Sequence, residues 1–451
     1  MAVETPPPLD VAIIGAGIAG LSASIALKRS DSFNIVKIYE KSTFKNEIGA
    51  AITLTPNANR ILDRWGFDAK AYGETDKLLV RMVNAATLDV EYQFGFQDVP
   101  ERFGHNFNAF HRVDLHRGLR TMAEDLGVEI LLGKEVVDLG CGDGLLNFKD
   151  GASVKHDLIV VADGIRSELV KGVSGLDVVP QKIGKSVFRG LIPMQRLRDD
   201  PLIWSQFQNQ PSGFYSTTHN GLFFMTYPCS SDEIMNVAVF HSTRPGHESD
   251  EGWSSPATKA EVLSVLDAQD LHPFWRGVVN AASSDEDFKC FPISLREPIS
   301  RYNNGRAILI GDAAHPFQPT HAQGGCLGIE DAQSLATLFR NTCSASTDIA
   351  LRCQLYNDLR LPRGNVTQLY SNVMFYHMKD GVLDGEKYQR KLREYYDGPL
   401  MPMNVRAWGR EHQEFWYRYD ADQEAEKAME WFEKEGTKGQ RLPSGVVKYF
   451  Y

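Results

Sequence analysis

The sequence predicts a mixed α/β fold in which one parallel sheet is assembled from distant parts of the chain. Near the start, an apolar strand runs into a glycine-rich turn and an Ala-rich helix, DVAIIGAGIAGLSASIALKRS. Near residue 310, a second apolar strand ends in Gly311-Asp312. Between 179 and 290 the chain contains alternating apolar runs that are typical of antiparallel strands. We therefore expect a discontinuous Rossmann-like domain, an inserted antiparallel β-sheet domain and a helical C-terminal segment.

The glycines near the start match the fingerprint of a dinucleotide site. Gly15 is expected to make the tight turn, Gly17 to let the backbone approach a pyrophosphate, and Gly20 to let the helix pack on the strand. The next apolar run, FNIVKIYE, ends at Glu40, which is placed to bind the adenosine ribose. Because strand, helix and acid all occur in the required order, we predict that an adenine dinucleotide binds here.

Two further strands end in an acid beside a glycine. LIVVADGIRS ends in Asp163-Gly164, and Arg306–Ile310 leads into Asp312. Ligands bind at the carboxyl edge of open α/β sheets, so Asp312 is predicted to accept hydrogen bonds from ligand hydroxyls such as those of a ribityl chain. Gly324 and Gly325 precede a helical pattern, where backbone N–H groups and the helix dipole favour a ligand.

Composition excludes several classes of function. The 451 residues are 43% apolar, which is enough for more than one core, and the net charge of −10 argues against nucleic-acid binding. The six cysteines show no metal-ligand spacing, so no metal site is expected and reduced thiols are the simplest interpretation. The first residues lack a signal-peptide pattern and no window reaches ~18 apolar residues, so a cytoplasmic protein without a membrane anchor is expected.

The motif positions predict four segments. They are a first cofactor-binding part (1–178), a β-rich substrate domain (179–290), a second cofactor-binding part (291–373) and a helical segment (374–451). Within the insert, SSPATKAEVLSVLDAQ is predicted to be a helix capped by a Ser or Thr near residues 254–258. The charged pattern DQEAEKAMEWFEK predicts a helix in the last segment.

Together, Gly15, Asp163-Gly164 and Gly311-Asp312 give the chain a resemblance to the class A flavoprotein monooxygenases. These are aromatic hydroxylases of the para-hydroxybenzoate and salicylate hydroxylase type, with similar fungal enzymes of secondary metabolism. The resemblance implies that FAD is the cofactor and that NADPH or NADH reduces it. It also implies that O2 then forms a C4a-hydroperoxyflavin, which hydroxylates an electron-rich aromatic ring.

The resemblance also implies further FAD contacts. EIGAAITLTPNA is similar to the family loop that passes the isoalloxazine, where Gly49, Ala50 and Ala51 allow a close approach. HRVDLHRGL looks like the segment whose arginine, here Arg112, reaches FAD. A third glycine cluster, GCGDG at 140–144, is interpreted as a hairpin turn. A nicotinamide cofactor would therefore dock transiently at the flavin.

Two positions depart from the family pattern. Ala322 stands where the family commonly has Gly, and Cys326 where it often has Asn. Both residues are small, so the departures affect the geometry of the helix start beside the flavin more than FAD binding itself. Pro319, in the same loop, is expected close to the place where oxygen reacts.

The substrate side of the site is predicted from the insert. Arg189, in VFRGLIP, is the candidate for stabilising a phenolate, because it interrupts an apolar strand and relatives acting on phenolic polyketides place an arginine there. Without a register, that strand could instead point Arg189 to solvent. Tyr227 is the candidate hydrogen-bond partner of the substrate, although a core tyrosine is nearly as good an interpretation. His219 and His315 are weaker candidates, and His315 is expected to shape the GDAAHP loop.

Two alternative functions stay open at this stage. The same flavin chemistry would carry out 2,3-epoxidation of an indole, and a flavin reductase or scaffold would bind FAD without oxygenation. The sequence does not distinguish phenol from indole or NADPH from NADH. It also leaves the regiochemistry and the oligomeric state open.

Overall fold

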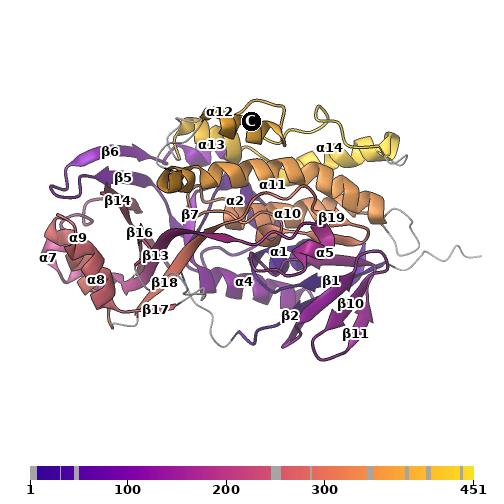
Figure 1. Ribbon diagram of the computed structural model, residues 1–451, viewed down its shortest axis with the longest axis horizontal. Helices are drawn as coiled ribbons and strands as arrows, with labels where there is room; N and C mark the ends of the chain where they lie inside the picture. Colours follow the sequence, from indigo (N-terminus) through magenta and orange to yellow (C-terminus); the bar gives the residue numbers. More distant parts are fainter. Residues whose placement is uncertain are drawn as a thin grey trace, which may run out of the picture.

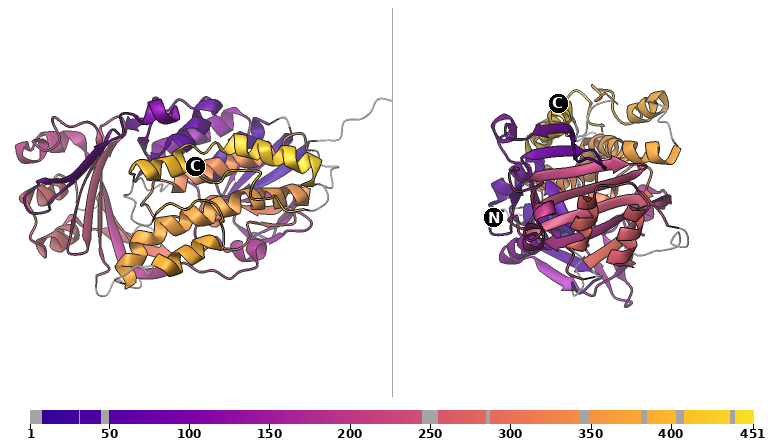
Figure 2. Two further views of the ribbon diagram at one scale, coloured as in Figure 1. Left: turned by 90° about the horizontal axis from the view of Figure 1, so that it is seen from above. Right: turned by 90° about the vertical axis from the view of Figure 1, so that its left-hand side faces the viewer.

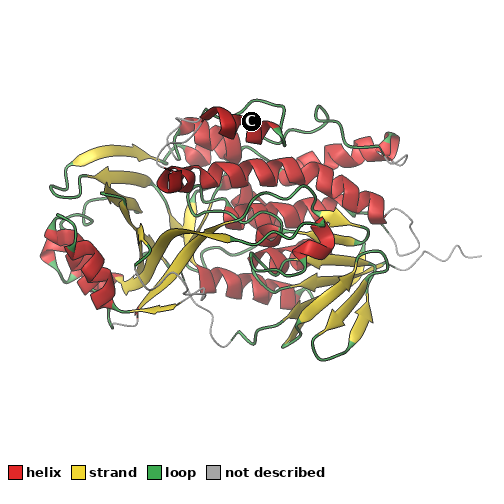
Figure 3. Cartoon of the chain, viewed as in Figure 1, coloured by secondary structure: helices red, strands yellow, loops and turns green. Residues whose placement is uncertain are grey.

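The computed structural model describes residues 8–30, 32–44, 50–244, 255–284, 287–342, 349–380, 385–402, 408–436 and 440–451. Figures 1 and 3 show a large sheet with its own outer helices on one side and an α/β body on the other. Long helices run along the top of that body (Figure 1). The view from above in Figure 2 shows the large sheet standing edge-on beside the body.

The parallel sheet of the body is built from both ends of the chain. Its order is β19-β20-β12-β1-β2-β8, and every pair is parallel except β19 with β20. β1, β12 and β20 are entirely or almost entirely buried, which explains why they appear in the sequence as continuous apolar runs. The strands are β1 Leu9–Ile14, β2 Phe33–Glu40, β8 Glu129–Leu132, β12 Leu158–Val161, β19 Asn303–Asn304 and β20 Ala307–Leu309. The predicted discontinuous Rossmann-like domain is confirmed.

Helices from distant parts of the chain pack beside this sheet. α1 (Ile18–Lys28) contacts both α10 (Gly324–Leu338) and α4 (Arg112–Asp125). Small residues on α1 allow this close packing, and almost the whole helix is buried. The remaining helices here are α2 Pro56–Trp65, α3 Val99–Phe103 and α5 Val170–Ser174.

Two small sheets complete the body. β9 (Val136–Gly140), β10 (Leu145–Phe148) and β11 (Ser153–Lys155) are antiparallel, so the hairpin predicted at residues 140–144 is confirmed. The second sheet has the order β3-β7-β4, with β3 at Ala51–Leu54, β4 at Thr75–Asp76 and β7 at Asn108–His111. It carries the loop that was predicted to pass the flavin.

The inserted sheet is larger than expected. Its order is β17-β18-β13-β16-β15-β14-β5-β6, and β14 pairs with β5 in parallel, so the sheet is mixed rather than purely antiparallel. β5 and β6 belong in sequence to the first cofactor-binding segment, but they join this sheet, because strands pair with the strands that lie beside them in space. The strands are β5 Leu79–Val83, β6 Val90–Gly95, β13 Gln181–Pro193, β14 Gly213–His219, β15 Leu222–Cys229, β16 Ile234–Ser242, β17 Ser255–Ala257 and β18 Phe288–Leu295.

The outer face of this sheet is covered by short helices, seen at the left of Figure 1. They are α6 Met194–Arg198, α7 Pro201–Trp204, α8 Lys259–Asp267 and α9 Pro273–Asn280. Phe188, Phe224 and Val239 pack with Trp275 in a core of their own. Thr258 caps α8 through a capping box with Glu261, which confirms the predicted helix and its cap.

The C-terminal segment is helical, as predicted, and lies over the body. Its helices are α11 Ile349–Asp380, α12 Gly385–Arg393, α13 Arg410–Tyr417 and α14 Ala421–Lys434. α11 runs across the predicted boundary at residue 374. The four-segment division therefore stays a prediction, with β5 and β6 belonging to the large sheet and α11 spanning two segments.

No helix in the described part of the chain combines the length and the apolar character needed to cross a membrane.

Candidate active site

Three strand ends meet at one edge of the parallel sheet. Gly15 follows β1, Asp163 follows β12, and Asp312 follows β20, so these motifs gather at the carboxyl edge where the sequence placed them. Gly15 has φ of +97°, and a Cβ there would lie 2.7 Å from the Ala162 carbonyl oxygen. Because the backbones of the two motifs are in contact, only glycine fits at this position.

The other fingerprint residues also lie as expected. A Cβ on Gly20 would lie 2.0 Å from the Gly15 carbonyl oxygen, which shows how closely α1 crosses the turn. A Cβ on Gly17 would meet nothing within 4 Å, so this backbone faces open space. The Glu40 carboxylate accepts a 2.8 Å hydrogen bond from the Ala16 N–H, which ties the acid to the turn.

A cavity of about 340 Å³ lies between this edge and the large sheet. It brings together residues from motifs that are far apart in the sequence. Gly15, Gly20, Glu40 and Asp163 lie around the fingerprint turn and not on the lining, whereas Gly164 does line the cavity. Gly49 is outside the described residues. The predicted residues on the lining are Gly17, Ala51, Arg112, Arg189, Tyr227, Asp312, Pro319, Gly324 and Gly325.

Burial changes the acidity of the carboxylates at this edge. The pKa of Asp163 is raised to about 6, mainly by burial, and its Oδ1 atom is buried without a hydrogen-bond partner. Burial also raises the pKa of Asp312, while His315, Arg296 and Arg112 act in the opposite direction. For both acids, burial thus outweighs the nearby groups that favour the charged carboxylate.

The register of the large sheet decides where Arg189 points. Arg189 pairs with Ala238, and Ala238 pairs with Met225, so the three residues form one row across β13, β16 and β15. All three line the cavity, whereas Phe188 faces the outer core. Arg189 therefore faces the cofactor edge and not the solvent, which was the alternative left open by the sequence.

The Arg189 guanidinium has no hydrogen-bond or ion-pair partner among the described residues. The guanidinium carbon instead lies 5.8 Å from the centroid of the Phe291 ring. Burial lowers its pKa, an effect that Tyr227 opposes and Arg112 reinforces. An arginine stays protonated in such a place, so the cavity wall carries an uncompensated positive charge.

Tyr227 contacts the cofactor side of the cavity. Its hydroxyl donates a 3.2 Å hydrogen bond to the Ala51 carbonyl oxygen. Asn236, from the neighbouring strand, accepts a 3.2 Å hydrogen bond from the Ala51 N–H. The large sheet thus holds β3 through both the carbonyl oxygen and the N–H of Ala51. Sequence reasoning missed Asn236, because a lone Asn in an apolar strand carries no signal of its partner.

Comparison with known proteins identifies the family. The model of an FAD binding domain matches residues 8–364. The chain is 29% identical over 440 residues to the FAD-dependent monooxygenase cfoG of Aspergillus candidus, covering 95% of this chain and 96% of that protein. It is 30% identical to 3-hydroxybenzoate 6-hydroxylase 1 of Aquipseudomonas alcaligenes, covering 88% and 96% of the two chains.

The chain belongs to the FAD-dependent monooxygenases. The structure of a salicylate hydroxylase substrate complex has the same fold, with a TM-score of 0.72 at 24% identity over 93% of this chain and 98% of the other. The resemblance inferred from the motifs is confirmed, and so are FAD as cofactor and the class of enzyme.

The geometry of this monooxygenase fits FAD. Gly17 and Gly164 present open backbone, since a Cβ on either would meet nothing within 4 Å. Gly17 also begins α1 without a side-chain cap, which leaves the positive end of that helix available to a pyrophosphate. Asp163 offers an unpaired buried oxygen, and Asp312 offers a carboxylate on the cavity wall. We assign these residues, with Arg112, to FAD as a prediction.

The two histidines have different places in the monooxygenase. His315 Nε2 lies 2.7 Å from Asp331 Oδ2, which also accepts a 2.9 Å hydrogen bond from the Gly311 N–H. It therefore lies in the network that shapes the loop after β20, as expected. His219 lies at the β14–β15 turn beside Asn220, and it is not among the cavity-lining residues.

The two departures from the family pattern lie at the start of α10. Ala322 has φ of +58°, a left-handed conformation in which glycine is favoured. The Cys326 thiol donates to the Ala322 carbonyl oxygen at 3.0 Å and contacts Thr55, and burial raises its pKa to about 12. Cys326 therefore acts as a small neutral residue that closes the turn.

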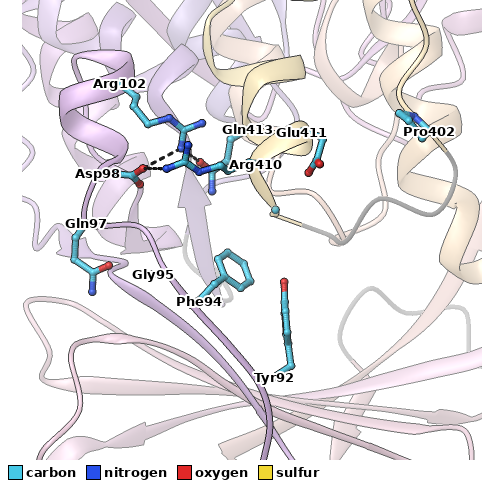
Figure 4. Close-up of a pocket in the computed structure, with 11 residues that line it drawn as sticks. Tyr92, Phe94, Gly95, Gln97, Asp98, Arg102, Pro402, Arg410, Glu411 and Gln413 are labelled. Carbon is cyan, nitrogen blue, oxygen red and sulfur yellow. Dashed lines mark hydrogen bonds and ion pairs between the residues drawn. The ribbon is translucent and has the colours of Figure 1, made fainter.

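A second cavity of about 700 Å³ lies between β6 and α13 (Figure 4). Its most prominent charges are paired, since Asp98 lies 3.4 Å from Arg102 Nη1 and 2.9 Å from Arg410 Nη2. Arg102 also bonds to Gln413 at 2.7 Å. Although this cavity is larger, none of the predicted cofactor residues line it.

Proposed function

We propose that this monooxygenase hydroxylates a phenolic aromatic compound, using FAD, NAD(P)H and O2, in secondary metabolism. The observation that carries the proposal is Arg189, an unpaired cation on the cavity wall opposite the predicted flavin edge. The similarity to a hydroxylase of 3-hydroxybenzoate, itself a phenol, supports this substrate class. The fungal relative supports a biosynthetic role.

Arg189 makes a phenol more reactive by stabilising its anion. A cation beside a phenol lowers the pKa of the hydroxyl, and the resulting phenolate is a stronger carbon nucleophile than the neutral ring. Since Arg189 has no acid partner among the residues that the structure describes, its charge is available to the substrate. A low-dielectric wall containing Phe214, Met225 and Phe240 strengthens this interaction and excludes water.

Bound FAD would supply the activation of O2, and the protein would supply position and charge. The predicted net reaction consumes one O2, one NAD(P)H and one proton. It forms one C–O bond on the ring in place of a C–H bond, and it yields NAD(P)⁺ and water. The described fold contains one dinucleotide fingerprint, at Gly15–Gly20, so the nicotinamide is proposed to dock transiently.

The test is anaerobic stopped-flow reduction of the bound flavin by NADPH and by NADH, with phenols and indoles as effectors. Acceleration by phenols, followed by a hydroxylated product once O2 is added, is the expected result. Acceleration by indoles alone would favour epoxidation. Steady NAD(P)H oxidation with an organic acceptor and no O2 would favour a reductase.

The role of Arg189 is tested separately. Arg189→Ala should abolish hydroxylated product while FAD content stays at the wild-type level. Arg81→Ala is the matched control, because Arg81 lies on the same sheet but bonds to Gln93 and Gln210 outside the cavity. Full turnover in Arg189→Ala would contradict the assignment.

A further inference from the structure

Trp408 has an unusual backbone for a large aromatic residue. Its φ is +62°, in the left-handed region that bulky side chains rarely adopt. It comes two residues before α13 begins, and its carbonyl oxygen accepts a 2.8 Å hydrogen bond from Gln413 Nε2. Strained conformations of this kind persist where the surrounding structure holds them, and they concentrate at functional sites.

The strained backbone brings the indole ring to the wall of the FAD cavity. The ring stacks on Phe214 with centroids 4.5 Å apart and an interplanar angle of 26°. Phe214 in turn lies 5.0 Å from the Tyr227 ring. Trp408, Phe214 and Tyr227 all line the cavity, so the indole is part of an aromatic wall on the side of the large sheet.

The indole N–H of Trp408 is buried and has no partner among the described residues. Buried polar groups in proteins are almost always paired, so an unpaired donor needs an explanation. Three other tryptophans of the chain follow the rule. Trp65 donates to Gln333 at 2.9 Å, Trp275 to the Ala85 carbonyl at 3.0 Å, and Trp416 to Thr367 at 3.0 Å.

Most other side-chain donors of the cavity wall are already paired within the protein, which indicates what kind of group a substrate must offer to the rest. The Tyr227 hydroxyl donates to Ala51, the Gln318 amide to the Ser294 carbonyl, and the Gln323 amide to Thr55. The Thr53 hydroxyl and the Asn236 amide also line the cavity, and each of them combines a donor with an acceptor. Apart from Arg112, which is predicted to contact FAD, the lining groups of the described residues that can only donate and have no partner are the Arg189 guanidinium and the Trp408 N–H. Both require acceptor atoms.

We propose that Trp408 is a specificity-determining residue that recognises a second oxygen of the substrate. Its N–H donates a hydrogen bond to a carbonyl or carboxylate oxygen, while the ring hydroxyl of the same compound lies at Arg189. The substrate class is therefore a planar phenol that carries an acceptor oxygen apart from the reacting hydroxyl. This inference rests on the proposed function, because it assumes that a phenol occupies this cavity.

The experiment measures binding to the oxidised holoenzyme with two probes of similar shape. 4-Hydroxyacetophenone has the second oxygen and 4-ethylphenol lacks it, and their dissociation constants are obtained from perturbation of the flavin spectrum. The wild type should bind the ketone at least about fivefold more tightly, and Trp408→Phe should remove this preference while keeping the ring stack and the FAD content. The expected size corresponds to one net hydrogen bond.

Trp65→Phe is the matched control, because it removes a paired indole N–H outside the cavity and should leave the preference unchanged. A Trp408→Phe enzyme that keeps the preference would overturn the inference, as would a wild type that binds both probes equally or neither. The preference is measured without turnover. A wild type that shows it and yet forms no hydroxylated product would overturn the proposed function alone, while a phenol hydroxylase without it would overturn only the role of Trp408.

Discussion

The hydroxyl group of Tyr227 donates a hydrogen bond to the backbone carbonyl of Ala51, which lies 176 residues away in the sequence. This contact joins the large sheet to β3, the strand that begins at the edge of the FAD cavity. With Asn236 on the Ala51 N–H, it fixes the distance between the substrate wall and the cofactor wall. The catalytic role of Tyr227 at the substrate stays a prediction.

Tyr227→Phe should loosen this connection. We expect FAD content to be retained and the yield of hydroxylated product per NAD(P)H to fall roughly two- to tenfold, because one net hydrogen bond at a buried site is lost. The measurement is product formed and peroxide released per NAD(P)H consumed. Tyr215→Phe is the control, since that hydroxyl bonds to Gln206 away from the cavity. An unchanged yield in Tyr227→Phe would show that the contact does not control the reaction geometry.

Ala322→Gly should stabilise the protein. The φ of +58° destabilises the folded state by about 1–2 kcal/mol for an alanine, and glycine removes that strain. The greater freedom of glycine in the unfolded chain offsets part of the effect, so a net stabilisation of about 1 kcal/mol is expected. Urea unfolding of the holoenzyme measures it. Ala332→Gly, in the interior of helix α10 that follows Ala322, should instead destabilise by about 1 kcal/mol or more. Loss of stability in Ala322→Gly would show that the alanine methyl contributes more by packing than its backbone costs.

Asp163→Asn should stabilise the apoprotein in a pH-dependent manner. The folded pKa of about 6 lies above the ordinary value of 3.8, so the folded state favours the neutral acid. The contribution of Asp163 to stability is therefore present below pH ~4 and is lost as the pH rises through about 6.

The difference between wild-type and Asp163→Asn apoprotein should thus be small at pH 4 and on the order of 1–3 kcal/mol at pH 8. Thermal unfolding of both proteins at these two pH values measures it. The same substitution should weaken FAD binding if Asp163 contacts the cofactor. A pH-independent difference would mean that the carboxylate finds a partner in the folded apoprotein.

Arg363→Met should destabilise the protein strongly. Arg363 is fully buried, donates to Glu330 at 2.6 and 2.7 Å, and lies 3.7 Å over the Tyr419 ring. Its removal leaves Glu330 with Arg360 as its one remaining cation among the described residues and takes away the hydrogen bond to the Tyr449 carbonyl oxygen, and the expected cost is about 3–5 kcal/mol.

The double variant Glu330→Gln with Arg363→Met tests the reason for that cost. Because it removes both charges, it should recover part of the lost stability, and urea unfolding of the single and double variants gives the coupling. A neutral effect of Arg363→Met alone would show that Arg360 is a sufficient partner for Glu330.

Local patterns were enough to predict the cofactor edge. Gly15, Asp163 and Asp312 each follow an apolar strand, and parallel strands necessarily bring their carboxyl ends together, so sequence order alone placed them at one site. The helix cap at Thr258 and the hairpin after β9 were also predictable, because both depend on a few neighbouring residues. The membership of β5 and β6 in the large sheet was not, since their partners are distant in the chain.

By itself, the sequence determined the fold class, the dinucleotide fingerprint and the family, because these depend on glycines, acids and apolar periodicity within short windows. Tertiary structure decided the substrate wall. Which face Arg189 takes depends on the register of β13 with β16, and the partner of Tyr227 depends on how the sheet meets β3. The unpaired N–H of Trp408 likewise exists only once Phe214 and the cavity surround it. Each of these features is a relation between residues remote in sequence, and only packing in three dimensions sets such relations.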